Sequence, residues 1–299
     1  MLTIFSTPKP FDGQIGIIQR NALESWKRID PDIEIILFGN EEGAAGAARS
    51  LRIRHVPDVE RNEHGTKYLT SIFDQAQQMA RYSTVCYINC DIVLTSDFRQ
   101  ALTQVSARFP RFLMVGQRWD TDVTEPIDFY DGQWASLLRD KARAANHQRP
   151  PNWIDYFAFS RGLFLRNTPP FVIGRPGWDN WLLWKARASA AAVVDVSGVV
   201  MVIHQNHNYS YHPDGEAGVW QGEEAQRNYA LLRGGRYFRT MENATHFLTS
   251  AGFERNWRHW SVLAKRTGHA FAKSALFAML DWTRPIRDRI GLRRQWKPR

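Results

Sequence analysis

The sequence has little cysteine and no long apolar stretch. Two of the 299 residues are cysteine, which excludes a scaffold stapled by disulfides. No uncharged apolar run approaches the roughly 20 residues that a membrane-spanning helix needs, so a polytopic membrane protein is excluded. The sequence also lacks a G-x-x-x-x-G-K-[ST] motif, and no G-x-G-x-x-G follows the first expected strand. These absences argue against a P-loop NTPase and a Rossmann dinucleotide enzyme.

What is present indicates a folded protein. Hydrophobic residues make up 43% of the chain, which is enough to build a core. The N-terminal segment MLTIFSTPKP has neither the basic region nor the apolar core of a signal peptide, so we expect a cytoplasmic protein. Cys86 and Cys90 would lie about 13 Å apart along one strand, too far for a disulfide, so free thiols are expected.

The positive charge is confined to one end of the chain. Residues 251–299 contain twelve Lys/Arg and three Asp/Glu, whereas residues 1–250 contain 27 of each sign. The charge distribution therefore favours a basic C-terminal tail with its own anionic partner over a basic groove across the fold. Residues 270–280 are apolar but too short to span a bilayer, and could lie on a membrane surface at the inner membrane.

Strand and helix patterns alternate over the first 115 residues. Strands are expected at 2–6, 33–38, 51–56, 85–88 and 112–115, a turn at 39–46, and helices over 15–29 and 69–79. This alternation predicts an α/β fold with a mostly parallel twisted sheet flanked by helices. The second half is less regular, with long loops around 117–134 and 144–156, a helix over 177–188 and one strand over 193–203.

Polar residues follow three of the expected strands, at the ends where α/β proteins bind ligands. The loops are Thr7-Pro8-Lys9, Asn40-Glu41 and Asn89-Cys90-Asp91. A carboxylate at a strand end with an amide two residues earlier suits a hard divalent cation that bridges phosphates. The alternative is a turn that ends the strand, since Asn and Asp favour turns for their own reasons.

The order of these elements, followed by Tyr87-Ile88-Asn89-Cys90-Asp91-Ile92, resembles the GT-A glycosyltransferases, in a bacterial-type branch of the nucleotide-diphospho-sugar transferases. The resemblance covers about residues 1–210 and departs from the family's Asp-x-Asp motif at Asn89. It implies a nucleotide-sugar-binding half over 1–125, an acceptor-binding half of the same domain over 126–250, and the tail over 251–299. It also implies Mn²⁺ or Mg²⁺, held by Asp91 and by a late histidine that matches His204.

Further site residues follow from the resemblance. Donor contacts are expected from Thr7, Pro8, Lys9, Asn40, Glu41, Asn62, Thr66, Asn89, Arg118 and Asp120, and acceptor contacts from Trp153, Asp155, Tyr156 and Trp178. For Lys9 an exposed loop position is an equal alternative, and for Asn62 and Thr66 helix capping is favoured. Packing or surface ion pairs are equal alternatives for Arg118, Asp120 and the acceptor residues. His204 is weighed against an ordinary loop histidine, and His207 and His212 are ranked below it.

Asp179 is the expected catalytic residue. It lies in Gly177-Trp178-Asp179-Asn180-Trp181, where inverting GT-A enzymes carry the general base, and an apolar wall would raise a carboxyl pKa toward a useful range. Helix capping is the alternative role.

The sequence thus predicts a metal-dependent, hexosyltransferase-like enzyme of polysaccharide biosynthesis, with an inverting reaction favoured over a retaining one. It would move a sugar from a UDP- or GDP-type donor to a glycan or lipid-linked acceptor. The competing hypotheses are a non-catalytic glycan- or RNA-binding module with a degenerate metal site and, with less support, a sugar-nucleotide pyrophosphorylase.

Overall fold

The computed structural model describes residues 1–208 and 213–257. Residues Met1–Arg255 form one compact unit, so the two predicted halves share one body. The first half contains β1 (Thr3–Ser6), α1 (Gly13–Ile29), β2 (Glu34–Phe38), α2 (Ala44–Leu51), β3 (Arg54–Val56), α3 (Leu69–Met79), β4 (Thr84–Ile88), β5 (Ile92–Val93), α4 (Ser96–Arg108), β6 (Phe112–Val115) and β7 (Arg118–Thr121). The second half contains α5 (Trp134–Ala145), β8 (Tyr156–Ser160), α6 (Trp178–Ala188), β9 (Ala192–Asp195), β10 (Val202–Gln205), α7 (Gly215–Gln221), α8 (Glu223–Leu231), a 3-10 turn (Met241–Asn243), β11 (His246–Thr249) and β12 (Gly252–Arg255).

The central sheet has nine strands in the order β12-β11-β9-β6-β8-β4-β1-β2-β3. β8 runs antiparallel to both neighbours and β12 runs antiparallel to β11, while the remaining pairs are parallel. The predicted mostly parallel α/β sheet is therefore confirmed. Residues 252–255, assigned from sequence to the tail, form the edge strand β12, and residues 258–299 of that tail lie outside the described part of the chain.

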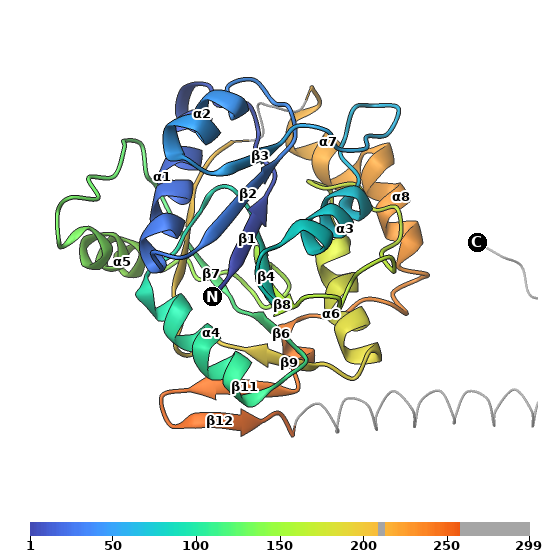
Figure 1. The fold of residues 1–299 in the computed structure, drawn as a ribbon. Coiled ribbons are helices and arrows are strands. Elements are labelled where there is room, and N and C mark those ends of the chain that lie inside the picture. Colours follow the sequence, from blue (N-terminus) through green and yellow to red (C-terminus); the bar gives the residue numbers. More distant parts are fainter. Residues whose placement is uncertain (209–212, 258–299) are drawn as a thin grey trace, which may run out of the picture. The chain divides into compact units, whose positions relative to one another are not determined.

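Helices cover both faces of this sheet. In Figure 1, α1, α2 and α4 lie to the left of the central strands, and α3 and α6 lie to the right. Successive residues of β1 alternate between the two cores, with Ile4 facing α1 and Phe5 facing α3. Both side chains are fully buried, and each such burial contributes about 1.5–3 kcal/mol. None of the described helices is both long and apolar enough to cross a bilayer.

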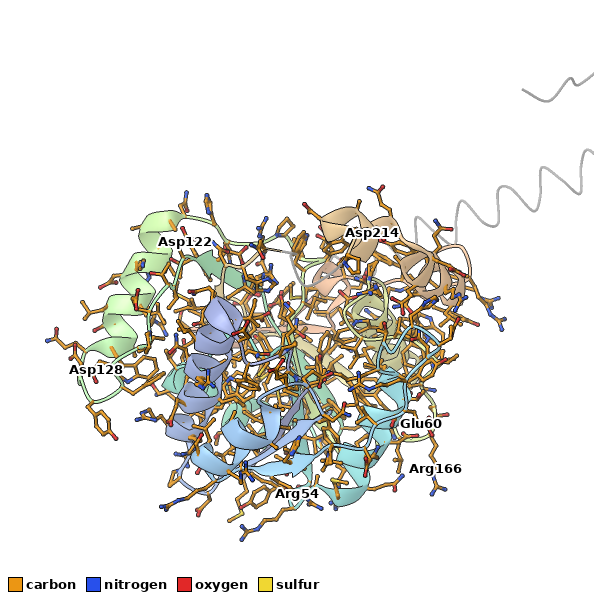
Figure 2. All side chains as sticks on the ribbon, turned by 90° about the horizontal axis from the view of Figure 1, so that it is seen from above. Arg54, Glu60, Asp122, Asp128, Arg166 and Asp214 are labelled. Atoms are coloured by element: carbon orange, nitrogen blue, oxygen red, sulfur yellow. The ribbon has the colours of Figure 1, made fainter. Side chains whose placement is uncertain are left out.

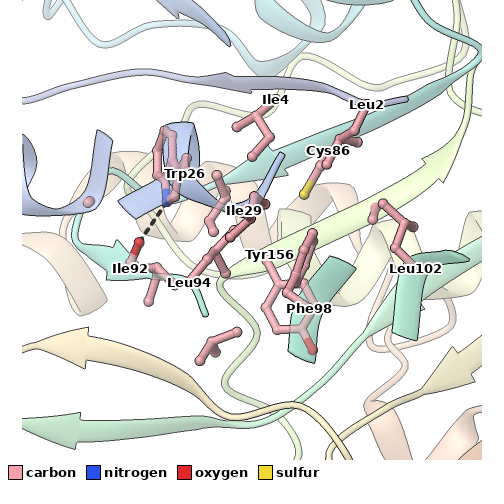
Figure 3. Packing of buried hydrophobic residues seen from close by; sticks show 14 of the residues in the cluster. Leu2, Ile4, Trp26, Ile29, Cys86, Ile92, Leu94, Phe98, Leu102 and Tyr156 are labelled. Atoms are coloured by element: carbon pink, nitrogen blue, oxygen red, sulfur yellow. Dashed lines mark hydrogen bonds between the residues drawn. The ribbon is translucent and has the colours of Figure 1, made fainter. Parts of the chain in front are cut away.

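A small second sheet, in the order β5-β10-β7, lies next to the end of β4. Its central strand pairs His204 with Ile92 on one side and with Asp120 on the other. The fully buried Trp26 ties α1 to this sheet, because its indole N–H donates to the Ile92 carbonyl oxygen at 2.8 Å (Figure 3). The small sheet thereby fixes the backbone immediately after Asp91.

Several sequence-based predictions of elements were wrong. The long loop expected around 117–134 contains the strand β7. The turn expected over 39–46 ends early, because α2 begins at Ala44. The strand expected over 51–56 is shorter than predicted, since α2 includes Leu51 and β3 begins at Arg54. The single strand expected over 193–203 is two strands, β9 and β10, which belong to different sheets. Asp195 ends β9 by accepting hydrogen bonds from the Ser197 backbone and hydroxyl, and the chain turns there.

Candidate active site

A cleft of about 1270 Å³ opens at the carboxyl ends of β1, β2 and β4. Its lining comes from the loops after these strands, from the start of α6 and from α7. The predicted site residues that line it are Thr7, Pro8, Lys9, Glu41, Thr66, Asn89, Asp91, Arg118, Asp120, Trp153, Asp155, Trp178, Asp179 and His204. The expectation that strand-end loops meet at one rim is therefore correct.

Three predicted residues do not line the cleft. Tyr156 was expected to bind the acceptor, but it is fully buried in the core and packs edge-on against Phe98 at 5.5 Å (Figure 3). It follows Asp155 directly, and successive strand residues point to opposite faces, so the two cannot share a site. Asn40 is exposed and accepts a hydrogen bond from Arg61, while the Asn62 amide donates to Glu224, which itself lines the cleft.

Asp91, His204 and His207 form a candidate metal site. One ligand atom from each lies within 4.8 Å of the other two. The Asp91 Oδ2 atom is 3.2 Å from His207 Nε2 and 3.9 Å from His204 Nε2. The sequence ranked His207 below His204, because chain order alone does not reveal that the segment after β10 returns to Asp91.

The surroundings of the two imidazoles suit a metal ion. His207 Nδ1 is 2.8 Å from the Asn208 carbonyl oxygen, and His204 Nδ1 is 3.4 Å from Asp120 Oδ1. The Asn208 carbonyl oxygen only accepts hydrogen bonds, so a neutral His207 ring carries its proton on Nδ1 and its lone pair on Nε2, toward Asp91. The contact of His204 Nδ1 with Asp120 brings the two groups together without a hydrogen bond. The Asp91 Oδ1 atom is buried and has no hydrogen-bond partner among the described residues. Two nitrogens and a carboxylate fit Mn²⁺ better than Mg²⁺.

Asp91 is ionised at neutral pH, as a metal ligand requires. Burial alone would raise its pKa, but the contacts of the carboxylate with the His207 and His204 rings and the positive charge of Lys9 hold that pKa well below its ordinary value. The Lys9 ammonium itself lies 3.0 Å from His207 Nε2. The cation that was predicted from sequence to face a phosphate therefore stands directly beside the candidate metal site.

A network of buried ions supports His204 from behind. The Arg118 guanidinium bonds Asp120 Oδ1 at 2.9 Å and Asp155 Oδ1 at 2.8 Å, and Arg149 bonds Asp120 Oδ2 at 2.5 Å. Arg118 and Asp120 were expected to contact the diphosphate and a donor hydroxyl. In the structure they pair with each other and orient the His204 ring, as a carboxylate behind a metal-ligating histidine does.

The loop after β1 is held by a lysine that the sequence did not single out. Lys67 is 9% exposed and donates to the Pro8 carbonyl oxygen at 2.9 Å, to the Thr7 hydroxyl, and to Glu41 Oε1 at 2.7 Å. Arg61 bonds the same Glu41 oxygen at 3.0 Å. The sequence-based search considered the residues that directly follow the expected strands. Lys67 precedes a helix instead, so that search did not identify it.

Asp179 lies in the first turn of α6, where Gly177 adopts a positive φ of 101° at the N-cap. Asp179 Oδ1 accepts a hydrogen bond from the Gly177 backbone N–H at 3.1 Å, so the capping role and a place in the cleft occur together. Burial raises the pKa of this carboxyl to about 7, against the lowering effect of backbone hydrogen bonds from Asn180 and Gly177. A carboxyl with that pKa can exchange a proton near neutral pH.

Aromatic side chains form part of the cleft wall, but the two predicted tryptophans are less accessible to a ligand than expected. Trp178 is 6% exposed, and its ring packs against Tyr87 and Phe157 at 5.3 Å each. Trp153 has the Arg118 and Arg149 guanidinium groups 5.0 and 4.8 Å from its ring centroid, and Trp220 of α7 lies 5.5 Å away. The two predicted tryptophans therefore mainly pack against protein groups.

No protein-family model matches the chain, and no curated protein matches it either. Solved structures with a similar fold include S. aureus TarS in complex with UDP-GlcNAc, at 10% identity and a TM-score of 0.47, over 69% of this chain and 58% of that one. Another is glucosyl-3-phosphoglycerate synthase from Mycobacterium tuberculosis with Mn²⁺, UDP and phosphoglyceric acid, at 14% identity and a TM-score of 0.45, over 78% of each chain.

A third is the mannosyltransferase PcManGT from Pyrobaculum calidifontis with GDP-Man and Mn²⁺, at 15% identity and a TM-score of 0.45, over 71% of this chain and 58% of that one. The chain thus spans less than two thirds of the TarS and PcManGT structures. These neighbours are GT-A-type glycosyltransferases, the family that the sequence motifs resemble.

Proposed function

We propose that the protein is a metal-dependent glycosyltransferase that moves a sugar from a nucleoside diphosphate to a hydroxyl acceptor. One observation carries the proposal: a single cleft contains both a three-ligand cation site and a carboxyl whose pKa is about 7. The first suits a diphosphate leaving group and the second suits a hydroxyl nucleophile. A buried cluster of charged and polar groups costs desolvation free energy, so stability of the fold does not account for it.

The candidate metal ligands, Lys9 and Asp179 would have distinct roles in this reaction. Asp91, His204 and His207 would hold Mn²⁺ or Mg²⁺, which offsets the negative charge that develops on the leaving diphosphate. Lys9 adds a second positive charge at the same place. Asp179 accepts the proton of the acceptor hydroxyl as that oxygen attacks the anomeric carbon, while the bond to the diphosphate breaks. A base in this role favours an inverting reaction.

The substrate classes follow from the same chemistry. The donor is a UDP- or GDP-type sugar, bound by Thr7, Pro8 and Glu41 at the strand ends and by Thr66 in the loop before α3. The acceptor is a glycan or lipid-linked glycan of polysaccharide biosynthesis, met in the cytoplasm at the inner membrane. The binding-module alternative draws on the amide at Asn89, and in the structure that amide donates to Asp155 Oδ1 at 2.7 Å. A pyrophosphorylase would need a glycine-rich loop after β1, where this chain has Thr7-Pro8-Lys9-Pro10.

A thermal-shift panel tests the proposal. The protein is heated with UDP, GDP, CDP or dTDP, each with and without Mn²⁺, as wild type and as Asp91→Asn. We expect one nucleotide to stabilise the wild type only when Mn²⁺ is present, because Asp91 would hold an ion whose positive charge attracts the diphosphate. The variant should lose this stabilisation.

Asp128→Asn is the matched control, because it removes the same charge from an exposed loop beside α5 (Figure 2). It should respond to the nucleotide and the ion as the wild type does. If no nucleotide stabilises the folded wild type under any condition, the glycosyltransferase proposal is wrong. The nucleotide that does stabilise it names the base of the donor for product assays.

A further inference from the structure

Asn89, where the chain has an amide in place of an acid, makes two hydrogen bonds to one residue of the facing strand segment. β4 and β8 run antiparallel with Ile88 opposite Tyr156, so Asn89 lies opposite Asp155. The Asn89 backbone N–H donates to the Asp155 carbonyl oxygen at 2.9 Å, and its side-chain amide donates to Asp155 Oδ1 at 2.7 Å. An aspartate at 89 could not make the second bond and would set two carboxylates against each other.

Asp155 is held so that one of its oxygens remains available. Its Oδ1 atom takes hydrogen bonds from both Asn89 and Arg118. Its Oδ2 atom is buried and has no hydrogen-bond partner within the described ranges. Leaving a buried carboxylate oxygen without a partner is costly, so such an atom in a cleft indicates a ligand. Asp155 is 7% exposed and lines the cleft.

Asp155 also belongs electrostatically to the cation site. Arg118 connects it through Asp120 to the His204 ring, and Asn89 is two residues from Asp91. Asp155 is not one of the three side chains whose ligand atoms cluster, so it acts on a cation through space and through hydrogen bonds.

We propose that Asp155 supplies the second carboxylate of the cation site, in place of the acid that position 89 lacks, and that Asn89 is the residue that positions it. This inference rests on the proposed function for the existence of the cation site. The inference goes beyond the proposed function because it assigns the second negative charge of the cation site to Asp155, which precedes β8, and not to the residue that follows β4. It also implies that an acid at position 89, which would complete the Asp-x-Asp motif, weakens the cation site.

Exchanging the two side chains tests the inference. Mn²⁺ is titrated calorimetrically, without nucleotide, into the wild type, Asn89→Asp, Asp155→Asn and the double variant that carries both changes. Each single variant should bind Mn²⁺ about 10–100-fold more weakly, as is typical when a group behind a metal ligand is changed. The double variant again has one amide facing one carboxylate, so it should bind at least about tenfold more tightly than the weaker single variant.

Several results would overturn the inference. One is an Asn89→Asp variant that binds Mn²⁺ as tightly as the wild type or more tightly, and another is an Asp155→Asn variant with unchanged affinity. The exposed Asn167→Asp variant adds the same charge away from the cleft and should bind as the wild type does. If Asn89→Asp fails to fold, Asp155→Asn and the double variant still decide the question. A folded wild type that binds neither Mn²⁺ nor any nucleoside diphosphate would instead contradict the proposed function.

Discussion

Asp179 combines a buried carboxyl with a place in the cleft, and its pKa of about 7 sets a pH dependence. Only the ionised carboxylate can accept a proton, so turnover should rise with pH through a midpoint near 7. Asp179→Asn should lower kcat by about 10²–10⁴-fold and remove this rise, while Mn²⁺-dependent nucleotide binding stays intact. Steady-state rates between pH 5 and 9, with Asp128→Asn as control, measure both effects. An Asp179→Asn variant that keeps wild-type turnover would exclude the base role.

The same pKa also predicts how stability changes with pH. The folded-state pKa is raised above the ordinary value of 3.8, so the folded protein holds this proton over a range in which the unfolded chain has lost it. The wild type should therefore lose stability relative to Asp179→Asn as pH rises from about 4 to 7, and the gap should then stay constant. Thermal unfolding of both proteins at pH 5 and pH 8 measures the gap. An equal gap at both pH values would contradict the raised pKa.

A site residue could be predicted from the sequence when nearby elements alone determine its position. It could not be predicted when its partner lies far away along the chain. Asp91 follows a strand and Asp179 lies at the start of a helix, and the sequence marks both elements clearly, so their places in the cleft could be expected. Tyr156 could have been excluded, because strand alternation separates it from Asp155. Asn89 and His207 could not have been assigned, since their partners, Asp155 and Asp91, are 66 and 116 residues away along the chain.

At the scale of elements, one lysine holds the β1 loop and the β2 loop together. Lys67→Met removes its bonds to Thr7, Pro8 and Glu41 and leaves the Glu41 carboxylate with Arg61 alone. Breaking a buried ion pair costs about 3–5 kcal/mol, and the remaining arginine reduces this to about 2–3 kcal/mol. Urea unfolding measures the loss. The affinity for the nucleotide should also fall, because both loops line the cleft.

Arg143→Met is the matched control for that variant. It also breaks an ion pair, with Asp140 at 3.0 Å, but both side chains are more than half exposed. Such exposed pairs contribute about 0–1 kcal/mol. If Lys67→Met costs no more than Arg143→Met, the lysine does not hold the loops.

The elements themselves were predictable where one pattern dominated. α1 and α3 repeat apolar residues every three or four positions, and β2 and β4 are short apolar runs, so all four were expected. α2 was missed because Gly43 and Gly46 read as turn signals, although the positive φ of Gly43 forms the helix start. The 193–203 run was read as one strand although Ser197 and Gly198 interrupt it. The small sheet depends on pairings between distant segments, which no local pattern reveals.

At the scale of the whole molecule, the excess of positive charge lies entirely in the C-terminal segment of the chain. Residues 1–257 contain 28 Lys/Arg and 28 Asp/Glu, whereas residues 258–299 contain eleven and two. The positive charge that looks like a general affinity for nucleic acid therefore belongs to a segment outside the described part of the chain. Because the compact unit ends at Arg255, that segment can be removed without cutting a strand or helix of the unit.

A chain that ends at Trp257 should keep the chemistry of the cleft and lose its affinity for anionic surfaces. Each Lys/Arg near an anionic leaflet contributes about 1 kcal/mol, so the full chain should sediment with vesicles that contain phosphatidylserine. The shortened chain should remain in solution, with unchanged unfolding and unchanged Mn²⁺-dependent nucleotide binding. About 0.5 M NaCl should release the full chain, because salt screens such contacts. Equal vesicle binding by both chains would contradict the membrane role. Salt-sensitive RNA binding that disappears on truncation, without vesicle binding, would favour an RNA partner for the tail.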